Sequence, residues 1–161
     1  MRATLALLLL SGLTFRSEAR LKNKISPRAA KALSAPTSVV LYSLDPAVGP
    51  DGSGPKLHTF KILGKATLDG KQTATALKAF NAAVSSGDAS FFYNCFDPRQ
   101  ALRIVADNHT YDFLLCYKCH RLYVYEGEKV IETLGAGGSP EALKALLKDL
   151  RLPLAKTPDR P

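Results

Sequence analysis

Three cysteines are the residues of this 161-residue chain whose types and spacing indicate chemistry. Cys116 and Cys119 form a C-x-x-C pair that His120 follows directly, and Cys95 precedes the pair. C-x-x-C-H is the pattern of a haem c attachment site, whereas C-x-x-C alone occurs in redox pairs and in zinc sites. The residues around the motif decide between these chemistries.

The context of the motif disfavours haem c and thiol redox catalysis. Strand-forming residues flank the pair on both sides, whereas a reactive C-x-x-C cysteine is expected at a helix N-terminus. The single Met is the initiator, so it supplies no axial haem ligand. In an extended strand, residues three apart lie about 10 Å apart, too far for a disulfide unless the chain turns locally.

A predicted hairpin brings the third cysteine to the pair. Strand patterns before and after residues 107–109 predict an antiparallel hairpin with a short turn. A turn centred on positions 108 and 109 places Ala101 opposite Cys116, with Cys95 just beyond that end. We therefore expect the three thiols to share one site.

Two interpretations of this cysteine cluster stay open. In an oxidising compartment, a disulfide from Cys95 to Cys116 or Cys119 would close the hairpin base and leave one thiol. Alternatively, the three thiols and a fourth residue would hold Zn²⁺ in tetrahedral geometry. His120, turned inward, is the better fourth ligand, because the amide of Gln100 binds zinc poorly. The expected cofactor is therefore zinc or none.

Arg99, Gln100 and Arg103 lie at the start of the same hairpin. The arginines alternate with apolar residues and could present an anion site. Structural support is the simpler interpretation, with Arg99 paired to Asp97 or Asp112.

Two other features carry no recognisable motif. His58 and His109 are expected to face solvent in a loop or at a strand end. Residues 135–138, Gly-Ala-Gly-Gly, lack both the G-x-G-x-x-G pattern and the lysine of a phosphate-binding loop, so we interpret them as a flexible connector.

Two segments of the chain match a known pattern. CFDPRQALR, residues 95–103, precedes YDFLLCYKC, residues 111–119. Together they resemble a group of uncharacterised bacterial exported proteins with the pattern C-F-x-P-R-H-x-h-R followed by D-h-h-h-C-F-x-C, where h is apolar. The resemblance spans most of residues 38–155 and implies no established activity. The group has His at the position of Gln100 and an apolar residue at that of His120, which implies that this chain lacks the group's fourth ligand.

The N-terminus predicts export. Arg2 precedes an apolar run from Ala3 to Phe15, and residues 17–19, Ser-Glu-Ala, fit a signal-peptidase site. The run is shorter than the roughly 20 residues of a membrane span. We therefore predict that residues 1–19 are a cleaved signal peptide, that the mature chain has no transmembrane span, and that it is periplasmic or secreted.

The formal net charge of +8 does not indicate nucleic-acid binding. The basic residues are scattered along the chain, and their one cluster falls within residues 20–31. No nucleic acid is expected as a partner, and a protein of the envelope is the candidate partner.

The hydrophobic and charged fractions, 46% and 22%, are those of a globular domain. Residues 20–36 are predicted as a basic disordered linker, 37–155 as one domain and 156–161 as a disordered tail. Helices are expected over 69–86 and from Ser139 to before Pro153. Strands are expected over 38–44, 57–63, 90–96, 102–107, 110–117, 122–125 and 129–134.

Short turns between most of these strands predict antiparallel pairing. The expected fold is α+β, an antiparallel β-meander with two helices packed on one face. The expected function is that of a small exported binding or envelope-associated protein without catalysis. The alternative is a periplasmic redox protein that uses haem c or thiol–disulfide exchange.

Overall fold

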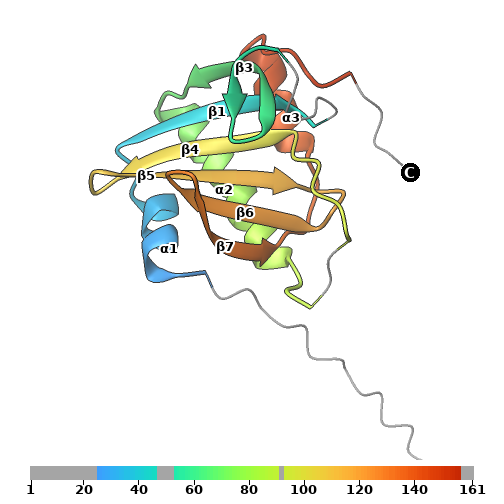
Figure 1. The fold of residues 1–161 in the computed structure, drawn as a ribbon. Coiled ribbons are helices and arrows are strands. Elements are labelled where there is room, and N and C mark those ends of the chain that lie inside the picture. The colour runs from blue at the N-terminus through green and yellow to red at the C-terminus, as the bar shows by residue number, and fades with distance from the viewer. Residues whose placement is uncertain (1–24, 47–52, 91–92, 157–161) are drawn as a thin grey trace, which may run out of the picture.

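A seven-stranded antiparallel sheet is the centre of the structure, a computed structural model that describes residues 25–46, 53–90 and 93–156 (Figure 1). The strands lie in the order β2-β3-β1-β4-β5-β6-β7. Their bounds are β1 Ser38–Asp45, β2 Lys56–Leu57, β3 Phe60–Thr67, β4 Gln100–Ala106, β5 His109–Cys116, β6 Arg121–Glu126 and β7 Lys129–Gly135. The predicted α+β class and the antiparallel meander are confirmed. The predicted signal peptide lies outside the described residues.

Three helices, not two, cover one face of this sheet. They are α1 Pro27–Ser34, α2 Gly70–Ser86 and α3 Glu141–Asp149. In α2 a capping box between Asp69 and Gln72 satisfies the first amides. Buried residues of all three helices share one apolar core with β1, β4, β5 and β6, and they include Phe80, Leu143 and Leu147. This core is the larger of the two apolar clusters.

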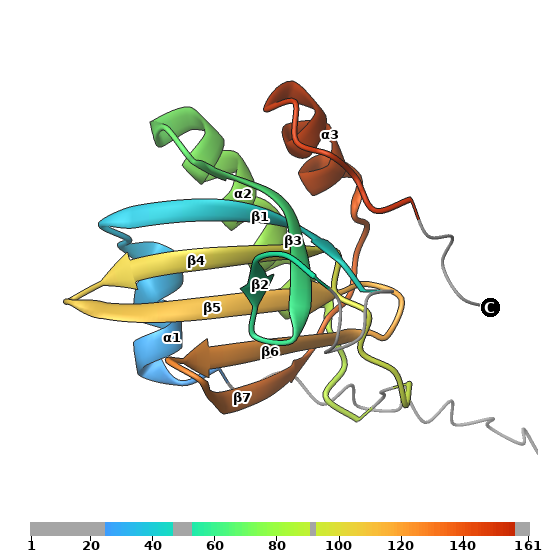
Figure 2. The ribbon, with the colours of Figure 1, turned by 45° about the horizontal axis from the view of Figure 1, so that its top comes forward.

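The opposite face of the sheet is covered by its own edge. The β2–β3 hairpin curls over β4 and β5, as Figure 2 shows. A second cluster forms beneath it from buried Tyr42, Leu44, Leu57, Ala101 and Leu114. The sheet is therefore buried on both faces at its centre, and polar groups there need partners within the chain.

The predicted disordered linker is wrong over its second half, because residues 27–34 form α1. Ser26 caps this helix by accepting a hydrogen bond from the amide of Ala29, and proline occupies the first turn. Ala29, Ala32 and Leu33 are buried in the larger core. The basic composition predicted disorder, but the basic side chains lie on the other face of an amphipathic helix.

The predicted strand over 90–96 is also wrong in its described part. Ser90 is in a turn, where its amide donates to Asp88 Oδ1 at 2.9 Å, and residues 93–96 form a loop. Aromatic residues suggested a strand there, but the side-chain hydrogen bond of Asp88 favours a turn. This loop carries Cys95 to the end of the sheet.

The β4–β5 hairpin exists, but its register differs from the prediction by two residues. Asp107 and Asn108 form a two-residue turn with φ angles of +49° and +61°, and Ala106 pairs with His109. Asn and Asp tolerate positive φ, which the tightest hairpin turns require at both positions. Ala101 consequently faces Leu114, not a cysteine.

Residues 135–138 are not a flexible connector either. A Cβ atom at Gly135 would lie 2.4 Å from the carbonyl oxygen of Asp88, and the amide of Gly137 donates to Ala83 at 2.9 Å. Glycine lets β7 pass directly against the end of α2, which fixes the path that leads into α3.

Candidate functional site

The cysteine turn, residues 117–120, brings the C-x-x-C pair together. β5 ends at Cys116, and the amide of His120 donates to the carbonyl of Tyr117 at 3.3 Å, with φ of His120 at +51°. The Cα atoms of Cys116 and Cys119 are therefore 5.3 Å apart. This is the local turn without which an extended pair would be too far apart.

The third cysteine arrives from the loop before β4. The amide of Tyr93 donates to the carbonyl of Cys119 at 3.4 Å, and the Cα atoms of Cys95 and Cys119 lie 5.7 Å apart. The three sulfur atoms all lie within 4.8 Å of one another, so the structure brings the three predicted cysteines into one group. The loop, and not the predicted hairpin register, places Cys95 there.

The sulfur of Cys119 is the centre of this group, because it contacts the sulfurs of both Cys95 and Cys116. A sulfur atom forms only one S–S bond, so the two contacts cannot both be disulfides. Backbone amides also point at the sulfurs. The amide of Cys119 donates to Cys116 Sγ at 3.1 Å, and that of Asp97 donates to Cys119 Sγ at 3.4 Å. Such hydrogen bonds favour the thiolate form that metal ions bind.

Neither candidate for the fourth ligand joins the cysteines. His120 Nδ1 lies 3.2 Å from the carbonyl oxygen of Ala136, and its ring packs against Tyr93 with centroids 5.6 Å apart. Among the described residues, the group of side chains placed to bind a metal contains cysteines alone. Gln100 lines a cavity instead. The cysteines could hold a metal ion with its fourth position open to an external ligand.

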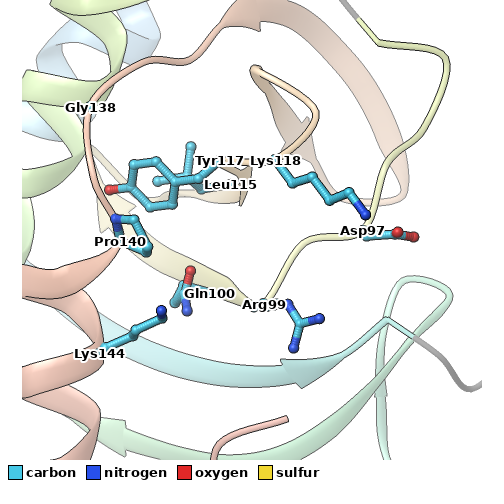
Figure 3. Close-up of a pocket in the computed structure, with 9 residues that line it drawn as sticks. All are labelled: Asp97, Arg99, Gln100, Leu115, Tyr117, Lys118, Gly138, Pro140 and Lys144. Atoms are coloured by element: carbon cyan, nitrogen blue, oxygen red, sulfur yellow. The ribbon is translucent and has the colours of Figure 1, made fainter. Parts of the chain in front are cut away.

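This cavity lies beside the cysteine turn and has a volume of about 400 Å³. Figure 3 shows Arg99, Gln100 and Lys118 at its wall, with Lys144 of α3 on the other side. The structure thus brings two of the three predicted anion or support residues, Arg99 and Gln100, to one cavity. Arg103 lies elsewhere.

Arg103 belongs to a second polar cluster, which we call the Asp112 cluster, composed of His58, Arg103, Asp112 and Glu128. Arg103 Nε lies 2.7 Å from Asp112 Oδ1, and Arg103 Nη2 lies 2.8 Å from Oδ2. His58 Nε2 lies 3.0 Å from Oδ2, and His58 Nδ1 lies 3.2 Å from Glu128 Oε2. The Tyr125 ring stacks on the His58 ring, with centroids 3.7 Å apart.

We did not predict this cluster from the sequence, and the prediction that His58 faces solvent is wrong, because its side chain is only 5% exposed. Asp112 was a predicted partner of Arg99, whereas in the structure it pairs with Arg103. An acid inside the apolar run of β5, directly opposite an arginine of β4, was the available signal. His58 gave none, because the curl of the β2–β3 hairpin brings it there.

Burial opposes the ionisation of Asp112, but the hydrogen bonds from Arg103 and His58 outweigh it and hold the pKa of Asp112 below its ordinary value. Burial also raises the pKa of Tyr117, beside the cysteine turn, to about 12. Asp112 is therefore a carboxylate at neutral pH and Tyr117 a neutral phenol.

Comparison with known proteins adds no family. No protein-family model matches the chain, and neither the curated proteins nor the solved structures contain a match. Within the described residues, no helix has the length and apolar character needed to cross a membrane. The function must therefore be argued from the geometry.

Proposed function

We propose that the chain is an exported, non-catalytic binding protein in which Cys95, Cys116 and Cys119 hold one zinc ion. The observation that carries the proposal is the shared sulfur of Cys119, which contacts both other sulfurs. Two disulfides cannot share one sulfur, whereas one metal ion can bind all three. The compartment and the envelope partner rest on the signal-peptide pattern and the resemblance alone.

The chemistry of the cluster supports zinc. Thiolates are the soft ligands that zinc prefers. Two sulfurs bound to one zinc at about 2.3 Å lie roughly 3.8 Å apart, so the three sulfurs, which lie within 4.8 Å of one another, would have to separate from their present contacts to admit the ion. Cys116 and Cys119 are buried, and two backbone amides donate to their sulfurs. When bound, zinc would tie the loop before β4 to the end of β5.

A disulfide staple is the second candidate, and the backbone spacing favours it. Cα separations of 5.7 Å and 5.3 Å both fall inside the range of about 4.4–6.8 Å found for disulfides. In an oxidising envelope one pair would form, and the third cysteine would stay a thiol. The two candidates therefore differ in thiol count and in metal content.

Elemental analysis and thiol titration of the chain from residue 20 onward test the proposal. Purified without added reductant and with zinc present, the protein should carry one zinc per chain and three reduced thiols, and a chelator should lower its melting temperature. Cys119→Ser should lose the zinc and the chelator effect. His120→Ala is the matched control and should keep the metal, because its Nδ1 faces Ala136.

A metal-free protein with one mapped disulfide and one thiol would contradict the zinc site and support the disulfide staple. Zinc lost in His120→Ala would mean that the ring rotates into the site. Export is tested separately by mass spectrometry of the protein from its native envelope, which should show the loss of residues 1–19. An intact chain in the cytosol would contradict export while leaving the metal measurement valid.

A further inference from the structure

We propose that the cavity beside the cysteine turn binds a small organic anion through a phosphate or carboxylate group, with Lys118 and Gln100 as its main contacts. This proposal does not depend on zinc. The observation behind it is Lys118 Nζ, which is buried and has no hydrogen-bond partner in the described part of the chain. Asp97 lines the same cavity but does not supply that partner.

A buried ammonium without a hydrogen-bond partner is costly, because the chain removes it from water and returns no hydrogen bond. The simplest reason for such a group beside an open cavity is that an anion completes it. Gln100, 3% exposed, also points its amide into the space, as Figure 3 shows. Lys118 and Gln100 lie at separate parts of the lining of this cavity, and an ammonium and an amide N–H are donors that phosphate or carboxylate oxygens accept.

The charge of the surroundings favours an anion. A second cavity of about 320 Å³ shares Arg99, Gln100 and Lys144 with the first and adds Lys148. The two linings together hold four cationic residues against two acids, Asp97 and Glu141, a balance of 4 − 2 = +2.

The start of α3 also contributes to this field. Pro140, at the N-terminal end of the helix, lines the first cavity, where the helix dipole adds positive potential. Glu141 offsets part of this through its exposed pair with Lys144, at 3.1 Å. Figure 3 places Pro140 and Lys144 on the opposite side of the cavity from Lys118, so positive groups flank the cavity on both sides, with Asp97 on the side of Lys118.

The size and the apolar wall indicate an organic anion. Each cavity has the volume of a small-molecule site. Leu115, Tyr117 and Pro140 give the first cavity an apolar side that an inorganic ion would leave unused. A small aromatic or aliphatic phosphate or carboxylate fits both the donors and this wall.

Calorimetric titration of the full mature chain tests the site with phenyl phosphate, benzoate, inorganic phosphate and neutral phenol. Phenyl phosphate and benzoate should bind, their ratio telling which anionic group the site prefers, and phenol should not. Lys118→Met, which keeps the aliphatic stem, should weaken anion binding at least tenfold. Lys129→Met is the control and should change nothing, since Lys129 is exposed at the start of β7, at the end of the sheet away from the cysteine turn.

Stability separates a binding lysine from a supporting one. The unliganded Lys118→Met protein should melt at the same or a higher temperature, because an unpaired buried charge is gone. No anion binding at millimolar concentration, or undiminished binding by Lys118→Met, would overturn the proposal. A lower melting temperature with lost zinc and unchanged anion binding would assign Lys118 to the cysteines instead. Repeating the anion titration on chelator-treated protein shows whether anion binding depends on the metal, and so whether the anion site or the zinc site fails alone.

Discussion

Strand β5 carries two polar clusters on one face, and they differ in how far the chain satisfies them. Asp112 and Cys116 are four positions apart on the strand, so both side chains lie on the face opposite the helices. In the Asp112 cluster both carboxylate oxygens accept hydrogen bonds from Arg103, and one also faces His58. At the cysteine end one sulfur contacts two others, and an ammonium nearby has no partner in the described chain.

This contrast separates support from binding. A buried polar cluster whose groups satisfy one another fixes the parts that supply them, here the turn of the β2–β3 hairpin and the centre of the sheet. A cluster in which some polar groups have no partner within the chain can bind a ligand from outside it. Asp112 ties the turn of the β2–β3 hairpin to the centre of the sheet, and the cysteine end is where we expect ligands.

Removing the charge of Asp112 should have the largest effect on stability. In Asp112→Asn, Arg103 and His58 lose their common anionic partner, and the His58 side chain stays buried. Breaking a buried pair costs about 3–5 kcal/mol. Because the Arg103 side chain is 39% exposed and can be rehydrated, we expect a loss near the lower end, about 3 kcal/mol, in urea unfolding.

Asp149→Asn is the matched control, since Asp149 is exposed at the end of α3. Its unfolding midpoint should match that of the parent. The zinc content of Asp112→Asn should also be unchanged if the two clusters are independent. A parent-like midpoint for Asp112→Asn would mean that the Asp112 cluster contributes no stability.

Acid should also weaken the Asp112 cluster, because protonation of Asp112 removes the charge that Arg103 and His58 contact. The pKa of Asp112 is held below its ordinary value, so the interaction contributes fully above the unfolded value of about 3.9. The contribution is lost as the pH falls through the lower, folded value. The stability difference between the parent and Asp112→Asn should therefore be constant from pH 7 to 5 and shrink below about pH 4. Urea midpoints at each pH measure it, and a constant gap at pH 3 would contradict this cause.

Most of the fold could be predicted because its signals are local. Strand alternation and turn residues predicted the antiparallel sheet, and the stripe of leucines predicted α3. The errors arose where the same local residue pattern is compatible with two conformations. Asp107 and Asn108 took positive φ, which moved the hairpin register by two residues, and the basic linker buried an alanine face as α1.

The candidate site was predicted only where sequence spacing carries it. Cys116 and Cys119 are visible as a motif, and the predicted hairpin added Cys95, although the loop before β4 and not the hairpin register places it there. His58 meets Asp112 from 54 residues away because the sheet curls, and no periodicity encodes that contact. Lys118 was hidden for a similar reason, since whether its ammonium is partnered depends on three segments that meet at the cavity.

Replacing His58 should have a smaller effect than replacing Asp112. In His58→Gln, Asp112 keeps both hydrogen bonds from Arg103 and loses one donor, and the stack on Tyr125 is lost. A hydrogen bond to a charged group contributes about 1.5–3 kcal/mol, and a neutral glutamine amide can replace part of it. We expect a loss of about 1.5 kcal/mol in urea unfolding.

The effects of the two substitutions should not add, because both remove the contact between His58 and Asp112. The double variant should unfold with less loss than the sum of the single losses. Strict additivity would show that His58 acts through Tyr125 alone. Either result shows whether the contact of His58 with Asp112 or its stack on Tyr125 fixes the β2–β3 hairpin to the sheet.

The smallest effect is expected at the outer end of the same imidazole. His58 Nδ1 faces Glu128 at 3.2 Å, a distance close to that on the Asp112 side, but the Glu128 side chain is 92% exposed. Water and salt screen such a contact, so Glu128→Gln should cost no more than about 0.5 kcal/mol. In 1 M salt this cost should vanish, whereas the loss in Asp112→Asn should persist, because the Debye length falls to about 3 Å but ions do not reach a buried pair. Parallel urea titrations at low and high salt make the comparison. Equal salt dependence in both variants would mean that solvent reaches the Asp112 carboxylate, and the contrast between a closed and an open cluster on β5 would have to be abandoned.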